Sequence, residues 1–265
     1  MPDADAIFAT GWQTVRSVLE CPASKGDKFY LLQGYEIVMG PKELVEETWR
    51  APLRKAAVSK WLIEVGRELG CSDIAYVPNA IDHERYRLMR PIEGRHSRIA
   101  MTFSKAPFKG AADGIEALEI VRGSYPNLEV VFFGLTNLRP SIPKWIEYYS
   151  DPSQEFIIQD IYNQASIFLS SSWSEGFALP PAEAAACGCA IVATDSGGIR
   201  DYVENGVTGL LSPPKDPKSL AENLCRVLDS EDLRVRLALA GKKRVTELSW
   251  ERSTDLLEDF LSGPM

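Results

Sequence analysis

Histidine, excess positive charge and long apolar runs are all scarce in this sequence. Two histidines and five cysteines occur among 265 residues, and only Cys187 and Cys189 are close together in the sequence. We therefore expect no metal site, because a structural zinc site normally needs four ligands. The formal net charge is −8, which argues against a partner nucleic acid, since phosphate-tracking proteins are basic. No apolar run approaches the roughly 18 residues that span a bilayer, so we expect no transmembrane segment.

The cysteine count and the first residues favour a cytoplasmic protein. An odd number of cysteines in a long chain suits a reducing compartment, where disulfides are rare. The opening MPDADAIFATGW has no basic residue before its short apolar run, which is unlike a secretory signal. A hydrophobic content of 45% and a charged content of 25% are typical of a folded globular chain and exclude general disorder.

Motifs of several large enzyme classes are also absent. The sequence contains no G-x-G-x-x-G and no G-x-x-x-x-G-K-[ST], which removes the main signatures of dinucleotide oxidoreductases and P-loop NTPases. It contains no G-x-S-x-G, and neither histidine follows a serine loop. A hydrolase triad is therefore not expected.

What the sequence does contain is a regular alternation of short apolar runs and amphipathic stretches, which predicts an α/β fold with parallel sheets covered by helices. The expected strands or strand ends of the first third are AIFAT (6–10), KFYLLQ (28–33), KAAVSKWL (55–62) and IAYVPN (74–79). The expected strands that follow are RIAMTF (98–103), LEVVFFG (128–134), SIFLS (166–170), AIVATD (190–195) and TGLLS (208–212). Expected helices include 59–70, 110–125, 180–188 and 198–206, and three more close the chain, with Asp216, Ser230 and Ser249 as N-caps.

One basic segment without periodicity, YRLMRPIEGRHSR (86–98), contains a proline and a glycine and predicts a linker. It separates an N-terminal unit, residues 1–88, from a C-terminal α/β domain, residues 89–250. The helical pattern of the last residues, 251–265, predicts a helix that crosses back toward the N-terminal unit. The N-terminal unit is short for an independent doubly wound domain.

Two glutamates, Glu175 and Glu183, lie in WSEGFALPPAEAAACG (173–188), directly after an expected strand. Open α/β sheets bind ligands at the carboxyl ends of their strands. The amides of residues 176–178 would point out of a helix N-terminus, where an anion such as phosphate is favoured. Carboxylates accept hydrogen bonds from paired sugar hydroxyls, so the pair suits a nucleotide sugar. The alternative is that Glu183 only favours the helix dipole in the first turn, which contributes about 0.3–1 kcal/mol.

A second loop, in SKAPFKGAADGIEAL (104–118), presents Lys105 and Lys109 before a helix that opens at Gly110. Lysines in such a loop can neutralise a diphosphate. The alternative is that both are solvated lysines of a surface loop. The turn in ATDSGGIRDYV (193–203) permits close approach of a ligand, although a tight turn alone would also require its two glycines.

Four segments follow one another in an informative order: VPNAID (77–82), FKG (108–110), FFG (132–134) and EGFALPPAEAAACGCAIVATDSGGIRDYVENGVTGLL (175–211). Together they resemble the C-terminal half of the retaining family 4 (group 1) glycosyltransferases, and the resemblance covers nearly all of residues 73–262. It implies the GT-B fold, with two Rossmann-like units and parallel sheets. The first third, with IFATGWQTV, KFYLLQGYE and VSKWL, is similar to the rhamnosyltransferase-like branch of that family.

The resemblance implies a role for each candidate residue. Glu183 would hold the ribose hydroxyls of the donor, and Glu175 would contact the donor sugar as a catalytic residue. Lys109 would stabilise the leaving diphosphate, so that no metal or other cofactor is required. The remaining donor-binding residues implied are Lys105, Gly110, Gly176, Phe177 and Ala178. Ser104 stands where the family has an arginine, and Lys105 beside it would substitute for that arginine.

Compared with the family, the N-terminal unit is incomplete, because it lacks the first strand and its glycine-rich loop. The segment QGYE (33–36) falls where many members place a His-Asp pair in the cleft, so Gln33 and Glu36 are expected on the acceptor side. Half a sheet would expose an edge strand and an apolar face, which proteins normally cover. We therefore expect a partner chain or a second copy to cover it, unless the sequence is part of a longer protein.

The function implied is transfer of a sugar, as by a hexosyl-type glycosyltransferase of polysaccharide biosynthesis, from a nucleoside-diphosphate sugar to a saccharide or other hydroxyl acceptor. An alternative remains open. In it, the chain is a donor-binding half-module that is inactive alone and needs a partner chain. The complete Glu175–Glu183 segment favours the enzyme, whereas the incomplete N-terminal unit favours the half-module.

Overall fold

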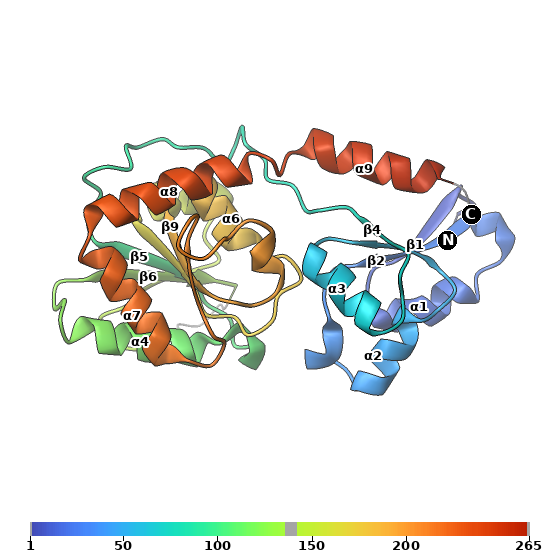
Figure 1. The fold of residues 1–265 in the computed structure, drawn as a ribbon, viewed down its shortest axis with the longest axis horizontal. Coiled ribbons are helices and arrows are strands. Elements are labelled where there is room, and N and C mark those ends of the chain that lie inside the picture. The colour runs from blue at the N-terminus through green and yellow to red at the C-terminus, as the bar shows by residue number, and fades with distance from the viewer. Residues whose placement is uncertain (1, 136–141, 264–265) are drawn as a thin grey trace. The chain divides into compact units, whose positions relative to one another are not determined.

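A computed structural model describes residues 2–135 and 142–263, and their contacts form two compact α/β units (Figure 1). Unit 1 comprises Met1–Ala80, Glu175–Phe177 and Trp250–Met265, and unit 2 comprises Ile81–Ser174 and Ala178–Ser249. Each unit contains one sheet in which every strand pair is parallel. The α/β fold class with two parallel sheets is therefore confirmed. No helix of the described residues is long and apolar enough to cross a membrane.

Unit 1 is built on a four-stranded sheet of order β1-β2-β3-β4. Its strands are β1 (Ala6–Ala9), β2 (Asp27–Leu32), β3 (Arg54–Ala57) and β4 (Ile74–Tyr76), and its helices are α1 (Trp12–Leu19), α2 (Lys42–Trp49), α3 (Lys60–Glu68) and α9 (Trp250–Ser262). The helices bury apolar side chains, among them Val15 of α1, Trp49 of α2 and Leu62 of α3. Burial of these side chains is the main stabilising contribution to the small unit.

The C-terminal helix α9 packs on the sheet of unit 1. The Phe260 ring meets the Phe29 ring edge-on, with 5.4 Å between centroids. The guanidinium of Arg54 lies 5.1 Å from the Phe29 centroid and 5.0 Å from the Phe260 centroid, and it donates to the carbonyl of Phe260. Ser253 Oγ donates to the carbonyl of Pro78 over 2.7 Å. The helix is therefore part of this unit although it is last in the chain.

Unit 2 contains a six-stranded sheet of order β10-β9-β8-β5-β6-β7. Its strands are β5 (Arg98–Thr102), β6 (Glu129–Gly134), β7 (Glu147–Ser150), β8 (Ile167–Ser170), β9 (Ala190–Thr194) and β10 (Leu210–Ser212). Its main helices are α4 (Ala111–Arg122), α6 (Leu179–Ala186), α7 (Pro217–Leu228) and α8 (Glu231–Val245). Helices α4 and α7 pack together, as do α6 and α8 (Figure 1). All five residues of β9 are buried, as in a parallel sheet covered on both faces.

Two expected N-caps of unit 2 are confirmed. The Asp216 carboxylate accepts the Ser219 N–H over 3.0 Å at the start of α7. The Ser230 hydroxyl accepts the Leu233 N–H over 3.2 Å at the start of α8. Both caps depend only on residues three positions away, which explains why the sequence predicts them.

Three sequence expectations are wrong. The expected strand 55–62 ends at Ala57, because Ser59 Oγ accepts the Leu62 N–H over 3.3 Å and starts α3. The expected helix 198–206 is only a 3-10 turn, Gly198–Asp201. The Thr208 hydroxyl accepts the N–H of Glu204 over 2.7 Å, and this bond holds the rest of that segment as a loop.

The third wrong expectation is the linker at residues 86–98. Ile92 is 1% exposed and belongs to the main apolar core of unit 2. The Arg95 guanidinium donates to the carbonyls of Ala165 and Cys187, each over 2.9 Å. An arginine whose donors are used by buried carbonyls fixes the segment to the unit, which composition alone does not reveal.

Candidate functional site

The order in which the chain adds strands to the sheet of unit 2 reverses between β5 and β8. From β5 the chain continues outward through β6 to β7, whereas from β8 it continues to β9 and β10 on the opposite side. Open parallel sheets bind ligands outside the carboxyl ends of their strands at such a point, where the flanking loops diverge. The loops that follow β5 and β8 contain Lys105, Lys109 and the segment 173–178. The predicted donor-binding loops are therefore neighbours by topology.

These two loops contact each other directly. The Trp173 N–H donates to the Phe108 carbonyl over 2.7 Å, and the Trp173 indole Nε1 donates to Asp113 Oδ2 over 2.6 Å. Gly110 has φ +61°, and a Cβ at this residue would lie 2.0 Å from the Ser171 carbonyl oxygen. Only glycine permits both this conformation and this close approach. Gly110 is thus required to bring the loop after β5 against the loop after β8.

The lysines of the loop after β5 differ in exposure. Lys105 is exposed, whereas Lys109 is partly buried at the end of the 3-10 turn Pro107–Lys109. The ammonium of Lys109 lies 5.5 Å from the centroid of the Phe108 ring. Ser104, at the position of the expected arginine, accepts the Ala106 N–H over 3.2 Å and so closes the turn. Of the two, Lys109 is the better positioned cation, because its environment limits its movement.

Glu183 lies in the second turn of α6, and the first turn of that helix contains no acidic residue. The alternative that Glu183 only interacts with the helix dipole in the first turn is therefore wrong, because that effect falls off within one turn. Another reason is needed for a carboxylate at this partly buried position.

Two tyrosines surround the Glu183 carboxylate. Tyr162 Oη donates to Glu183 Oε2 over 3.2 Å, and an interaction with the Tyr86 hydroxyl also lowers the pKa of this carboxyl group. Burial raises the pKa of Glu183, while the two hydroxyls lower it. Burial and the charge of Glu183 raise the pKa of Tyr86 to about 12. The phenols therefore remain protonated donors at neutral pH, and they stabilise the ionised carboxylate.

The segment Glu175–Phe177 groups with unit 1. A Cβ at Gly176 would lie 1.7 Å from the Gln33 carbonyl oxygen, so this position also requires glycine. The side chain of Phe177 is buried, at 3% exposure, and Glu175 is partly buried. The next residue, Ala178, is the N-cap of α6 with φ +69°. Its carbonyl accepts the Tyr202 hydroxyl over 2.5 Å, which holds this strained conformation.

The two residues expected on the acceptor side both bond to the start of α1. Gln33 Nε2 donates to the Thr10 carbonyl over 3.0 Å. Glu36 Oε2 accepts the Trp12 N–H over 2.9 Å and the Tyr30 hydroxyl over 3.4 Å. These contacts give both side chains a role in holding their loop against α1.

Sequence reasoning missed the tyrosines beside Glu183. Tyr86 follows the VPNAID segment, and Tyr162 ends a π-helical turn, Ile157–Tyr162. Neither residue is near Glu183 in the sequence, and neither stands in a pattern that predicts a polar contact. The only available signal was the presence of tyrosine, which usually finds a partner for its hydroxyl when buried.

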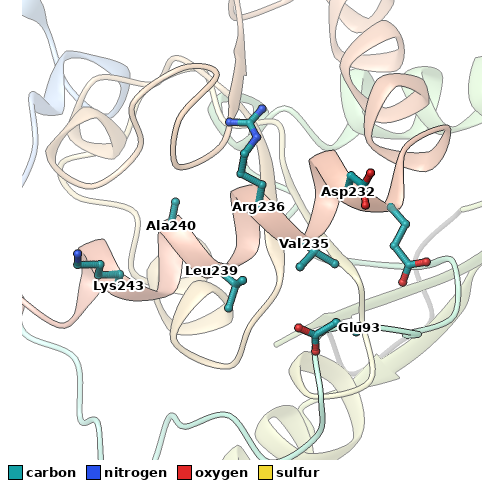
Figure 2. A pocket seen from close by; sticks show the side chains of 8 residues that line it. Glu93, Asp232, Val235, Arg236, Leu239, Ala240 and Lys243 are labelled. Atoms are coloured by element: carbon teal, nitrogen blue, oxygen red, sulfur yellow. The ribbon is translucent and has the colours of Figure 1, made fainter.

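A shallow groove of unit 2 lies away from these loops, along the outer face of α8 (Figure 2). Its apolar lining comes from Val235, Leu239 and Ala240, with Glu93 opposite the helix. Arg236, also on its lining, bonds to the Gly206 carbonyl over 3.1 Å. None of the predicted site residues lines this groove, so it does not define the candidate site.

A family of known proteins matches the part of the sequence that contains these loops. The sequence model of the family described as "Glycosyl transferases group 1" matches residues 103–244, which include the loops after β5 and β8. The chain belongs to the group 1 glycosyltransferases. The matched residues make up most of unit 2.

Within the described residues, no three His, Cys, Asp or Glu side chains lie close enough together to hold a metal ion.

Two D-inositol 3-phosphate glycosyltransferases are among the similar proteins. The one from Thermomonospora curvata is 31% identical over 115 residues, which are 43% of this group 1 glycosyltransferase and 27% of that protein. The one from Frankia alni is 28% identical over 173 residues, which are 65% of this chain and 39% of that protein. The chain thus covers well under half the length of these relatives.

Solved structures show the same fold. The structure of TarM has a TM-score of 0.83 at 12% identity, covering 98% of this chain and 56% of that chain. Anabaena Alr3699/HepE in complex with UDP has a TM-score of 0.80 at 16% identity, covering 97% of this chain and 78% of that chain. At identities this low, the structural likeness shows only that this group 1 glycosyltransferase has the GT-B fold.

Proposed function

We propose that this chain binds a nucleoside-diphosphate sugar and takes part in transferring the sugar, with retention of configuration, to a hydroxyl acceptor. The observation that carries the proposal is the arrangement at the turning point of the unit 2 sheet. There Lys109 lies in the loop after β5, and Glu183 follows the loop after β8. A cation for the diphosphate and a carboxylate for the ribose diol are the groups such a donor needs.

In the proposed mechanism, Lys109 and the backbone amides at the start of α6 stabilise the negative charge of the leaving diphosphate. Such preorganised donors act where charge develops in the transition state. The bond between the anomeric carbon and the phosphate oxygen breaks, and the acceptor hydroxyl forms the new bond on the same face. The leaving phosphate oxygen takes the proton of that hydroxyl. Glu175 contacts the donor sugar, and we assign no step to a metal ion.

The similar proteins support this proposal and indicate which donor nucleotide to test first. One structural neighbour, Anabaena Alr3699/HepE, was solved both in complex with UDP and in complex with UDP-glucose, which makes UDP the first donor nucleotide to test. We propose a hexose as the transferred sugar and a saccharide as the acceptor. A rhamnosyl donor stays a prediction of the sequence resemblance. Lys105, Gly110, Gly176, Phe177 and Ala178 complete the proposed donor site.

Calorimetric titration of the purified chain with a panel of nucleoside diphosphates tests the proposal. We expect saturable binding of at least one of them, with an unchanged affinity when EDTA is present. No binding of any nucleoside diphosphate at millimolar concentration would overturn the assignment of the donor site. A strict dependence on a divalent cation would overturn the metal-independent mechanism.

Release of free nucleoside diphosphate from a sugar donor tests turnover separately. We expect steady release by the chain and a decrease of roughly 10²–10³-fold in Glu175→Ala, in which a catalytic contact is lost. Glu204→Ala is a matched control, because Glu204 is an exposed glutamate of unit 2 outside the proposed site. Binding without release would instead support a donor-binding half-module that needs a partner chain.

A further inference from the structure

We propose that Tyr86 and Tyr162 are positioning residues that hold the Glu183 carboxylate ionised and oriented for a ribose diol, with Tyr86 itself held by Arg85 and Gln154. This inference rests on the proposed function, because it assumes that Glu183 binds the ribose of the donor. All five residues belong to unit 2.

The hydrogen bonds around Tyr86 form a chain with a defined direction. The Arg85 guanidinium donates to Gln154 Oε1, which leaves the amide nitrogen of Gln154 facing Tyr86. Gln154 Nε2 donates to Tyr86 Oη over 2.5 Å. Since the phenol oxygen accepts this bond, its own O–H is available to donate to Glu183. The charge of Arg85 polarises the chain, and successive hydrogen bonds of this kind strengthen one another.

Tyr162 reaches the carboxylate from a rigid position. Its side chain is 1% exposed, and its ring packs edge-on against Phe133 and Phe168, with 5.8 and 5.6 Å between centroids. A ring enclosed in this way has one rotamer available, so its hydroxyl is fixed 3.2 Å from Glu183 Oε2. The two tyrosines therefore approach the carboxylate from independent elements.

The acceptor capacity of the carboxylate matches the proposed ligand. An ionised carboxylate offers about four lone-pair positions. The two phenols use two of them, which leaves two for the adjacent 2′- and 3′-hydroxyls of a ribose. A protonated carboxyl group would lose part of this capacity. The tyrosines oppose protonation, since their hydrogen bonds lower the pKa that burial raises.

No other charged group performs this task within the described surroundings of Glu183. The groups that interact with its carboxylate are the phenols of Tyr86 and Tyr162 and the thiol of Cys187. Burial raises the pKa of the Cys187 thiol, so it stays neutral and places no charge beside the carboxylate. Arg85 acts on the carboxylate only through Gln154 and Tyr86.

The test compares Tyr86→Phe and Tyr162→Phe with the wild-type chain in calorimetric titrations with UDP and 2′-deoxy-UDP. We expect each variant to bind UDP about tenfold more weakly at neutral pH, as for loss of one hydrogen bond to a charged group. The difference in UDP affinity between each variant and the wild type should shrink as pH rises, because the Glu183 carboxyl group then ionises even without the missing hydroxyl. The preference for UDP over 2′-deoxy-UDP should decrease as well. Carboxyl ¹³C NMR of the free variants should show a higher pKa for Glu183.

Tyr125→Phe is the matched control. The Tyr125 hydroxyl donates to the Asp229 carboxylate, so this variant also removes a tyrosine–carboxylate bond from unit 2. We expect unchanged UDP affinity, because Tyr125 lies outside the proposed site.

Three outcomes would overturn the proposal. One is wild-type UDP affinity and an unchanged Glu183 titration in both variants. Another is an equal loss of affinity for UDP and for 2′-deoxy-UDP at every pH, which would indicate that the two tyrosines have a structural role only. The third is a wild-type chain that binds no UDP, which would contradict the proposed UDP donor as well. The wild-type titration thus separates failure of the proposed function from failure of this inference.

Discussion

Units 1 and 2 each contain a partly buried glutamate that accepts a tyrosine hydroxyl, and the two glutamates differ in their remaining partners. In unit 1, Glu36 accepts the backbone N–H of Trp12, at the first position of α1, together with the Tyr30 hydroxyl. In unit 2, Glu183 accepts only side-chain hydroxyls among the contacts described for it. Burial raises the pKa of both carboxyl groups.

The difference separates a structural carboxylate from a candidate ligand-binding one. A backbone N–H at a helix start has no partner within the helix, so Glu36 satisfies a requirement of the fold. The Glu183 carboxylate satisfies no backbone group of α6 in these contacts. A carboxylate that is expensive to bury and contributes no backbone bond needs a reason outside the fold, and a ligand is such a reason.

The largest expected effect distinguishes the two residues by binding. We expect Glu183→Ala to weaken UDP affinity about 100-fold, because two hydrogen bonds to a charged acceptor are lost. Glu36→Ala should leave UDP affinity unchanged if its carboxylate serves only the fold. Calorimetric titration of both variants measures the difference. Equal losses in the two variants would remove the functional distinction between the two glutamates.

A smaller effect distinguishes the two residues by stability. We expect Glu36→Ala to lower the free energy of unfolding of unit 1 by about 1–2 kcal/mol, because the first N–H of α1 loses its acceptor. Urea denaturation followed by hydrogen exchange of unit 1 amides measures this change. Glu47→Ala, an exposed position of α2, is the control and should change stability by less than about 0.5 kcal/mol. A Glu36→Ala chain as stable as this control would contradict the structural role.

The same two glutamates show how far sequence reasoning reaches. The sequence predicts the parallel α/β fold and the caps Asp216 and Ser230, because these depend on periodicity and on neighbours three positions away. It also places Lys109 and Glu183 in loop and helix positions after the correct strands. Those positions follow from the order of the elements along the chain.

What the sequence could not predict depends on distant partners. Glu36 meets Trp12 across 24 positions, and Glu183 meets Tyr162 across 21. No local pattern encodes either contact, so the sequence revealed neither the bond of Glu36 to Trp12 nor the tyrosine beside Glu183. The placement of Glu36 on the acceptor side stays a prediction of the family resemblance. The packing of residues 86–98 was missed for the same reason, since Arg95 finds carbonyls far along the chain.

The smallest expected effect is the dependence of stability on pH. Because burial raises the pKa of Glu36 and Glu183 above the ordinary value of 4.5, the folded chain binds these protons more tightly than the unfolded chain. Their contribution is fully present below the unfolded pKa and is lost as pH rises through the folded pKa. Glutamine does not titrate. The free energy of unfolding of the wild type, relative to Glu36→Gln or Glu183→Gln, should therefore fall as pH rises from 4.5 toward neutral.

Saturating UDP should make this dependence different for the two residues. A diol that binds the ionised carboxylate stabilises the folded chain more at neutral than at acidic pH, because the stabilisation by a bound ligand increases with the logarithm of its affinity. Glu36→Gln should keep this pH-dependent stabilisation by UDP, and Glu183→Gln should lose it. Thermal unfolding of the wild type and both variants, with and without UDP at several pH values, measures the linkage. If the Glu183→Gln chain still showed the wild-type dependence, the titrating group of the donor site would have to be another residue.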